Sequence, residues 1–126
     1  DINDLQKFSI ILSEKQKKEL KKYWPGQVSI VLDYADEKFA YLHCRTKSLA
    51  FRLPLNKNLQ EFLKIVGPLV APSANLEARP PSKDIFEAKK HFGNSVDLYV
   101  DGGLIENRAS QIIRLYKDGS TSIIRE

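Results

Sequence analysis

The chain has 126 residues, 42% of them hydrophobic and 29% charged, which is enough for one globular domain with its own core. No apolar run approaches the about 20 residues of a membrane-spanning helix, so we expect no membrane segment. The single cysteine excludes an internal disulfide and favours a cytoplasmic location, and no Cys/His cluster indicates zinc. A net charge of +4 and a pI of about 9.2 favour partners that carry phosphate.

The N-terminal segment predicts two helices. Hydrophobic residues at helical spacing indicate a short helix over 2–8. Ser13 and Gln16 have the spacing of a capping box, which opens a second helix over 14–23 before Trp24-Pro25-Gly26 ends it. The second helix carries five lysines that form either a solvated face or a phosphate-binding patch: Lys15, Lys17, Lys18, Lys21 and Lys22.

Three strands and one turn are predicted next. Alternating apolar residues indicate the strands, and a polar cluster indicates the turn: strands over 27–33, 39–44 and 48–53, and a turn over 35–38. In the last strand the apolar side chains share one face, which leaves Arg52 on the other. There it either reaches solvent or binds an anion.

The stretch from Pro68 to Asn75 predicts a buried strand that ends in a polar loop. A helix over 58–66, capped by Asn58, precedes it. Residues 69–71 form a short apolar run, and Pro72 cannot donate to a sheet ladder. Ser73 and Asn75 follow at the carboxyl end of the strand, where ligands bind in open α/β sheets. The alternative is an ordinary turn, which uses the same residue types.

The C-terminal part predicts one helix and three strands. Ser82 is expected to cap a helix that runs to Phe92, with His91 in its last turn, where a partly charged imidazole would favour the helix dipole. Strands follow over 96–100, 111–116 and 122–125, and Asp118-Gly119 is a hairpin signal.

Several stretches, in order, resemble the YrdC family of threonylcarbamoyl-AMP synthases. Phe51-Arg52-Leu53-Pro54 is similar to the family's V-R-V-P strand, and Pro68 to Asn75 is similar to its Pro-Leu-Val-Ala-(Pro/Thr)-Ser-Ala-Asn stretch. The remaining matches have the family's order and approximate spacing: Trp24-Pro25-Gly26, Val96 to Gly103, Ser110-Gln111-Ile112-Ile113 and Ile123-Ile124-Arg125.

The resemblance implies a single YrdC-like α/β domain over 1–126, with a twisted mixed sheet flanked by helices and a central cleft. It also implies an enzyme in which threonine and bicarbonate form a carbamate. The carbamate attacks the α-phosphate of ATP, bound with Mg²⁺, and releases pyrophosphate. The product, threonylcarbamoyl-AMP, then passes to downstream threonylcarbamoyl-transferase proteins for tRNA modification. Binding of tRNA or double-stranded RNA is a further expectation.

The resemblance assigns two sets of site residues. Arg52, Ala71 and Ser110 would bind threonine. The nucleotide would contact Ser48, Ser73, Asn75, Pro81 and Arg125. No residue is assigned as a catalytic group or as a metal ligand.

The sequence departs from the family pattern at three places, and one of them is Gln111, which follows Ser110 where the family has Thr. Glu77 and Ala78 follow Leu76, where the family usually has Ser-Gly. The family's N-terminal portion, with its Lys-x-Arg motif, has no counterpart, and the chain contains no Met, so we expect a piece of a longer protein. Two other functions stay open on the same fold. One is a nucleotide- or RNA-binding module without catalysis, and the other is a carbamoyl-transfer domain of hydrogenase maturation.

Overall fold

The computed structural model describes residues 1–34, 36–106 and 109–126, which divide into two compact units. The first unit comprises Asp1–Pro68 and Ala109–Glu126, and the second comprises Leu69–Arg108. The expectation of one family-type domain over the whole chain stays a prediction. No helix of the described residues has the length and apolar character that crossing a membrane requires.

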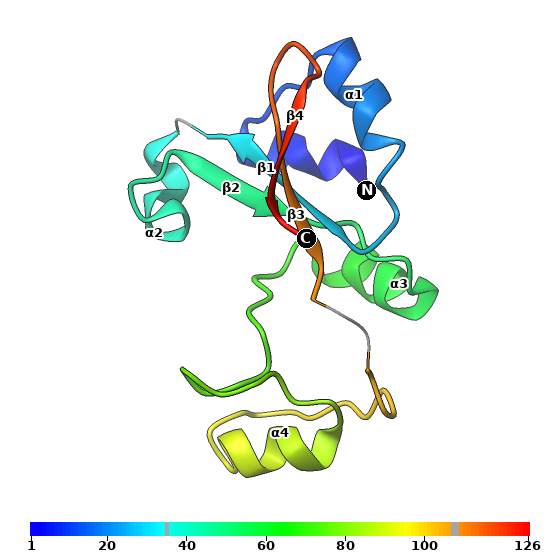
Figure 1. Cartoon of the computed structure of the whole chain (residues 1–126), viewed down its shortest axis with the longest axis vertical. Coiled ribbons are helices and arrows are strands. Elements are labelled where there is room, and N and C mark those ends of the chain that lie inside the picture. Colours follow the sequence, from blue (N-terminus) through cyan, green and yellow to red (C-terminus); the bar gives the residue numbers. More distant parts are fainter. Residues whose placement is uncertain (35, 107–108) are drawn as a thin grey trace. The chain divides into compact units, whose positions relative to one another are not determined.

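A four-stranded mixed sheet forms the centre of the first unit (Figure 1). Its strands are β1 (Val28–Asp33), β2 (Ser48–Phe51), β3 (Gln111–Leu115) and β4 (Thr121–Arg125), in the order β2-β1-β3-β4. β1 and β3 are parallel, and the other two pairs are antiparallel. Gly119, with a φ of 88°, allows the tight connection between β3 and β4. The mixed α/β class predicted from the sequence is confirmed, whereas the central cleft stays a prediction.

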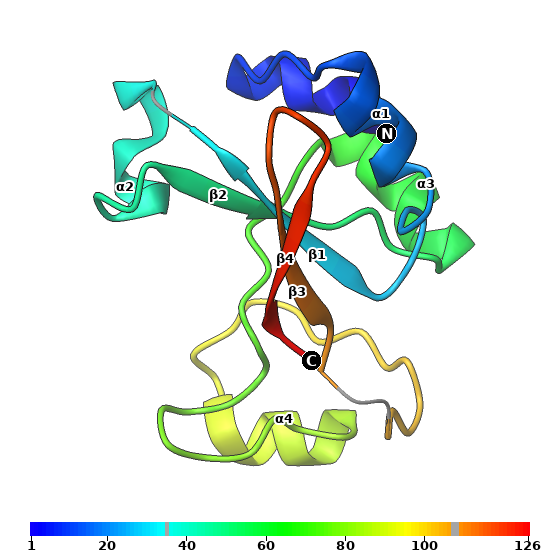
Figure 2. The same ribbon diagram turned by 45° about the horizontal axis from the view of Figure 1, so that its top comes forward.

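The core lies on one face of this sheet. A 3₁₀ helix, η1 (Ile2–Phe8), and α1 (Glu14–Leu20) supply its second layer, as Figure 2 shows. Strand alternation directs every second side chain to this face. The buried cluster consists of Leu5, Ile10, Leu12, Leu20, Trp24, Ile30, Leu32, Tyr34, Leu49, Ile113 and Leu115.

The predicted capping box at the start of α1 is confirmed. The Gln16 N–H donates to Ser13 Oγ at 3.1 Å, and the Ser13 N–H donates to Gln16 Oε1 at 3.0 Å. Ser13 Oγ also donates to the Lys117 carbonyl at 2.9 Å, which fixes α1 to the turn between β3 and β4. The helix ends at Leu20, and the residues up to Tyr23 form turns.

The strand predicted over 39–44 is wrong. Asp36 Oδ1 accepts the Lys38 N–H at 2.9 Å and starts a helical turn, η2 (Glu37–Phe39), which continues as α2 (Ala40–His43). Asp36 caps this turn, and Phe39 packs on Phe8 with the ring centroids 5.1 Å apart. These two contacts override the strand propensity of the aromatic residues. Part of the turn predicted over 35–38, namely Ala35, lies outside the described residues.

Two predicted helices exist, but their caps differ from the prediction. α3 (Lys57–Val66) is capped by Asn56, whose Oδ1 accepts the Leu59 N–H at 3.0 Å, so the predicted cap Asn58 is wrong. α4 (Ile85–Phe92) is capped by Asp84 rather than Ser82, since Asp84 Oδ1 accepts the Glu87 N–H at 2.8 Å. Both helices begin near the predicted place, but several polar residues compete for the cap at each start.

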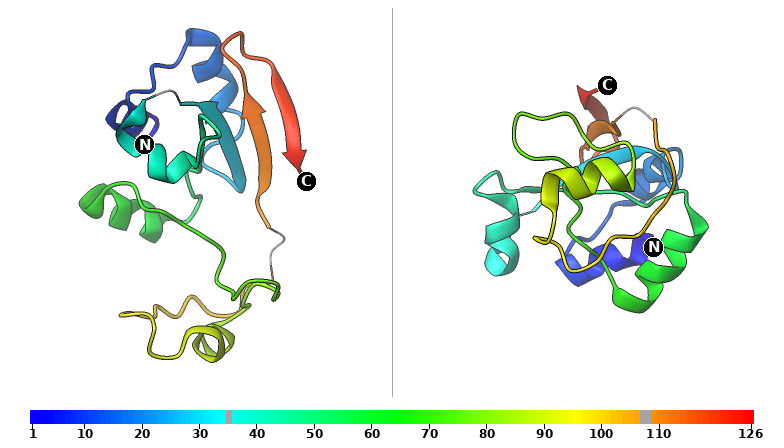
Figure 3. Two further views of the ribbon diagram at one scale, coloured as in Figure 1. Left: turned by 90° about the vertical axis from the view of Figure 1, so that its left-hand side faces the viewer. Right: turned by 90° about the horizontal axis from the view of Figure 1, so that it is seen from below.

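The strands predicted over 69–71 and 96–100 are also wrong. In the described part of the second unit, α4 is surrounded by irregular chain, which Figure 3 shows. Val70 and Val100 are 73% and 82% exposed, respectively. An apolar run becomes a buried strand only where a neighbouring strand pairs with it, and no such neighbour is found among these residues.

Candidate functional site

The register of the sheet brings three predicted site residues to one end of the first unit. Ile30 is level with Phe51 of β2 and with Ile113 of β3, and Ile112 is level with Arg125 of β4. The carboxyl ends of β2 and β4 therefore meet the amino end of β3. Arg52 directly follows β2, Ser110 directly precedes β3, and Arg125 ends β4.

Both guanidinium groups at this end contact Ser110. Arg52 Nη1 donates to Ser110 Oγ at 2.5 Å, and Arg125 Nη2 donates to the Ser110 carbonyl at 2.6 Å. A guanidinium has five N–H donors, so most donors of both groups are left for a ligand. Neither arginine forms an ion pair with the residues that the structure describes. Two permanently charged guanidinium groups beside one serine favour the binding of an anion at this end of the sheet.

Arg52 also lines a cavity of about 160 Å³ within the first unit. Its other lining residues come from η1, the segment before β1, the β2 end and α3: Asp1, Asp4, Leu5, Phe8, Trp24, Phe51, Leu53, Gln60, Leu63, Lys64 and Pro68. Most of these are apolar, and the charged lining residues are Asp1, Asp4, Arg52 and Lys64. The cavity is thus an apolar space with a guanidinium at its margin.

Two hydrogen bonds fix walls of this cavity. Trp24 Nε1 donates to the Val28 carbonyl at 2.9 Å, and Gln60 Nε2 donates to the Pro54 carbonyl at 2.6 Å. The hydrogen bond from Lys7 holds the pKa of the Asp4 carboxyl below its ordinary value. No sequence pattern indicates Gln60 as a lining residue, since its role depends on how α3 lies against the segment that follows β2.

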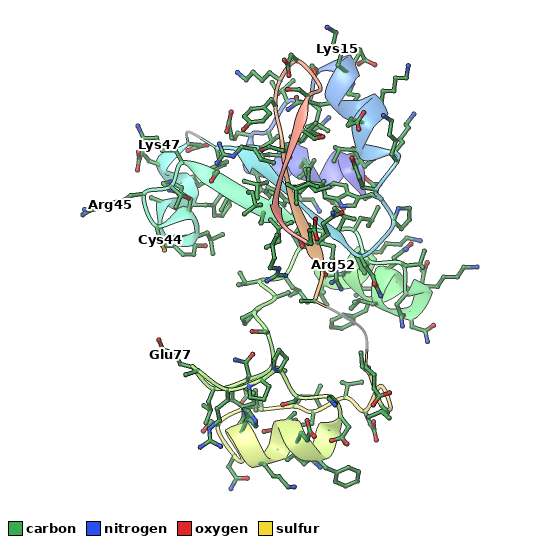
Figure 4. The ribbon with its side chains drawn as sticks, viewed as in Figure 1. Lys15, Cys44, Arg45, Lys47, Arg52 and Glu77 are labelled. Atoms are coloured by element: carbon green, nitrogen blue, oxygen red, sulfur yellow. The ribbon has the colours of Figure 1, made fainter. Side chains whose placement is uncertain are left out.

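Ser48 lies away from this cluster. It begins β2, level with Asp33, and its Oγ donates to Thr46 Oγ1 at 3.3 Å. Arg52 is four residues further on, a distance of roughly 13 Å along a strand. Figure 4 shows Arg45 and Lys47 at the Ser48 end of β2 and Arg52 at the other. The structure does not bring Ser48 to Arg52, and its contact with the nucleotide stays a prediction.

The other four predicted residues lie in the second unit. Ala71, Ser73 and Pro81 are exposed, and Asn75 is half-buried. Asn75 Nδ2 donates to the Leu76 carbonyl at 3.0 Å. Asn75 Oδ1 is buried and has no hydrogen-bond partner among the described residues. A buried acceptor without a partner is uncommon in folded proteins, and the contact of Asn75 with the nucleotide stays a prediction.

The described residues contain no group of three or more His, Cys, Asp or Glu side chains that could hold a metal ion. Mg²⁺ commonly reaches such sites bound to substrate phosphates, with one or two carboxylates or none from the protein. Binding of Mg²⁺ together with a nucleotide stays a prediction.

The Sua5/YciO/YrdC family model, described as "Telomere recombination", matches residues 1–126. A Klebsiella pneumoniae protein named threonylcarbamoyl-AMP synthase is 36% identical over 92 residues, which cover 72% of this chain and 48% of that protein. A Hahella chejuensis protein of the same name is 29% identical over 115 residues, which cover 90% of this chain and 60% of that protein. The chain spans about half the length of the curated relatives it matches.

Two solved structures share the fold. The crystal structure of E. coli YciO superimposes with a TM-score of 0.83 at 24% identity, covering 100% of this chain and 62% of that one. The crystal structure of P. abyssi Sua5 complexed with L-threonine gives a TM-score of 0.79 at 21% identity, covering 92% of this chain and 34% of that one. With the family match over all 126 residues, these similarities show that the chain belongs to the Sua5/YciO/YrdC family.

Proposed function

We propose that this chain belongs to a threonylcarbamoyl-AMP synthase and binds L-threonine at Arg52 and Ser110. The convergence of two guanidinium groups on Ser110 carries the proposal. Arg52 has a planar fork that matches a carboxylate, and it lines the cavity at the same time. Ser110 Oγ accepts from Arg52, so its own O–H is free to donate to threonine.

The size of the cavity supports a small substrate beside Arg52. Sites for drug-sized ligands have volumes of about 300–1,000 Å³, and this cavity has about 160 Å³. A short amino acid fits these limits, whereas a whole nucleotide does not.

The nucleotide would engage other residues. Arg125 would neutralise phosphate charge, and Asn75 Oδ1 would accept from an amino or hydroxyl group of the nucleotide. Ser73 and Pro81, both exposed in the second unit, are the further contacts we propose. Ala71 would contact threonine through its backbone, and Ser48 would contact the nucleotide.

The chemistry requires charge neutralisation and orientation rather than a protein nucleophile. Threonine and bicarbonate form a carbamate with release of water, and the carbamate oxygen then displaces pyrophosphate at the α-phosphate of ATP. Mg²⁺, when bound with ATP, would supply further neutralisation of the phosphates. Arg52 orients the carboxylate, and Arg125 provides fixed positive charge toward the phosphates. Preorganised charges of this kind commonly lower the activation barrier more than any other single effect.

The names of relatives favour this reaction over the two alternatives. The Klebsiella pneumoniae and Hahella chejuensis relatives are named threonylcarbamoyl-AMP synthase, and the P. abyssi Sua5 structure holds L-threonine. We further propose a cytoplasmic protein that contacts tRNA or double-stranded RNA and supplies its product to threonylcarbamoyl-transferase proteins. The five lysines between positions 15 and 22 and the net charge of +4 support the RNA contact.

Calorimetric titration with L-threonine tests the proposed function. Arg52→Ala should weaken binding roughly 10- to 100-fold, because a hydrogen bond to a charged group contributes about 1.5–3 kcal/mol. Arg45→Ala is the matched control, since Arg45 lies at the other end of β2 (Figure 4). Equal affinities in Arg52→Ala, Arg45→Ala and the unaltered chain would exclude Arg52 as the threonine contact.

A further inference from the structure

The Ser-x-Asn loop (residues 73–76) is closed by hydrogen bonds within the second unit. The Ser82 N–H and Ser82 Oγ both donate to the Ala74 carbonyl, at 2.9 and 2.7 Å. The Asn75 N–H donates to the Ser73 carbonyl at 3.0 Å. These contacts set the path of the loop. None of them joins the loop to α4.

His91 makes that connection. The Leu76 N–H donates to His91 Nδ1 at 3.0 Å, from a residue 15 positions earlier in the chain. A backbone amide can only donate, so Nδ1 must carry a lone pair and the ring proton must be on Nε2. The charged imidazole that the sequence suggests for the end of α4 could not accept this bond.

The bond acts on the residue that would meet the nucleotide. Leu76 directly follows Asn75, and the Leu76 carbonyl accepts from Asn75 Nδ2 at 3.0 Å. His91 therefore holds the Asn75–Leu76 peptide, and the carbonyl of the next peptide holds the Asn75 side-chain amide, so the two contacts together restrain the orientation of Asn75. This arrangement leaves Asn75 Oδ1 buried and without a partner among the described residues.

We propose that His91 is a positioning residue for the Ser-x-Asn loop. Its neutral ring holds the Leu76 N–H, and through Leu76 it orients Asn75 toward the nucleotide. The role in binding rests on the proposed function, whereas the contact with Leu76 does not. His91 acts through the loop and does not itself contact the substrate.

Two substitutions of His91 distinguish the effect of its hydrogen bond from the effect of the size of its side chain. His91→Phe keeps a ring but has no acceptor. His91→Asn places Oδ1 near the position of Nδ1 and restores an acceptor. His, Phe and Asn have similar helix propensities, so α4 should be equally stable in all three proteins. Melting temperatures and circular dichroism check this point.

Two readouts test the proposal on the full 126-residue chain. Nitrogen chemical shifts of the imidazole should show the tautomer protonated at Nε2, and exchange of the Leu76 amide with solvent should be slow. His91→Phe should speed that exchange and weaken binding of a non-hydrolysable ATP analogue with Mg²⁺ by about 2- to 10-fold. His91→Asn should restore both.

The outcomes are distinguishable. If Leu76 exchanges equally slowly in His91→Phe, or if His91→Asn behaves like His91→Phe in both readouts, the positioning role is refuted. If the unaltered chain does not bind the analogue but its Leu76 exchange responds as expected, His91 still holds the loop and the proposed function fails instead.

Discussion

Removing the hydroxyl of Ser110 should weaken threonine binding without unfolding the protein. The Ser110 O–H is the donor that we propose for threonine, and its oxygen accepts from Arg52 Nη1 at 2.5 Å, so Ser110→Ala removes a hydrogen bond to the ligand as well as the one that holds Arg52. A hydrogen bond to a charged ligand contributes about 1.5–3 kcal/mol, and the exposed Arg52 and half-buried Ser110 place the effect near the lower value. A loss of about 1.5 kcal/mol corresponds to roughly tenfold weaker binding. The stability should change by less than about 0.5 kcal/mol, because the site is at the surface.

A double-mutant cycle measures whether the two residues act together. Arg52→Ala, Ser110→Ala and the double variant are titrated with L-threonine by calorimetry, with Ser122→Ala as the matched serine control. Ser122 Oγ lies 3.2 Å from the Tyr116 hydroxyl and away from Arg52 in the sheet register. We expect a coupling free energy of about 0.5–1 kcal/mol between Arg52 and Ser110. Independent, additive effects of the two substitutions would refute the reasoning.

Three further predictions concern stability and RNA. Ser13→Ala should lower the free energy of unfolding by about 1 kcal/mol in urea titrations, since it removes the cap of α1, and an unchanged midpoint would contradict that role. The Ser120 hydroxyl and N–H hold the pKa of Asp118 below its ordinary value of 3.8. The stabilisation from Asp118 is therefore present above about pH 4 and is lost as the pH falls through the lowered pKa. The difference in melting temperature between the unaltered chain and Asp118→Asn should shrink between about pH 6 and pH 2, and a constant difference would argue against it. Replacing Lys18 and Lys21 by Gln should reduce the slope of log affinity for double-stranded RNA against log salt by about one for each phosphate that the variant no longer neutralises. An equal slope would place the RNA-binding surface elsewhere.

Local signals are sufficient to predict much of the sheet unit. The alternation in β1, the Asp118-Gly119 turn and the Ser13/Gln16 capping box each depend on neighbours in sequence, and each is found in the structure. The prediction for residues 39–44 fails because a short apolar segment fits a helix or a strand, and the Asp36 cap decides between them. The prediction for residues 69–71 fails because a strand requires a pairing partner that the run itself does not reveal.

The candidate site is only partly visible in the sequence. Arg52 is identifiable because it lies opposite the apolar face of a predicted strand. Its contact with Ser110 joins residues 58 positions apart, so it depends on the sheet register, which local patterns do not specify. Gln60 and His91 act through packing and backbone contacts and carry no motif. The family resemblance supplies the roles of Ser73 and Asn75, whereas the orientation of the Asn75 amide requires the structure.

The most direct test of the proposed threonine site is a crystal structure of this chain with L-threonine at saturating concentration. We expect the threonine carboxylate to contact the Arg52 guanidinium and the threonine side chain to enter the cavity beside Phe51 and Leu53. The Ser110 hydroxyl should lie within hydrogen-bonding distance of the ligand. Threonine bound at a different place, with Arg52 still contacting only Ser110, would contradict the proposed site.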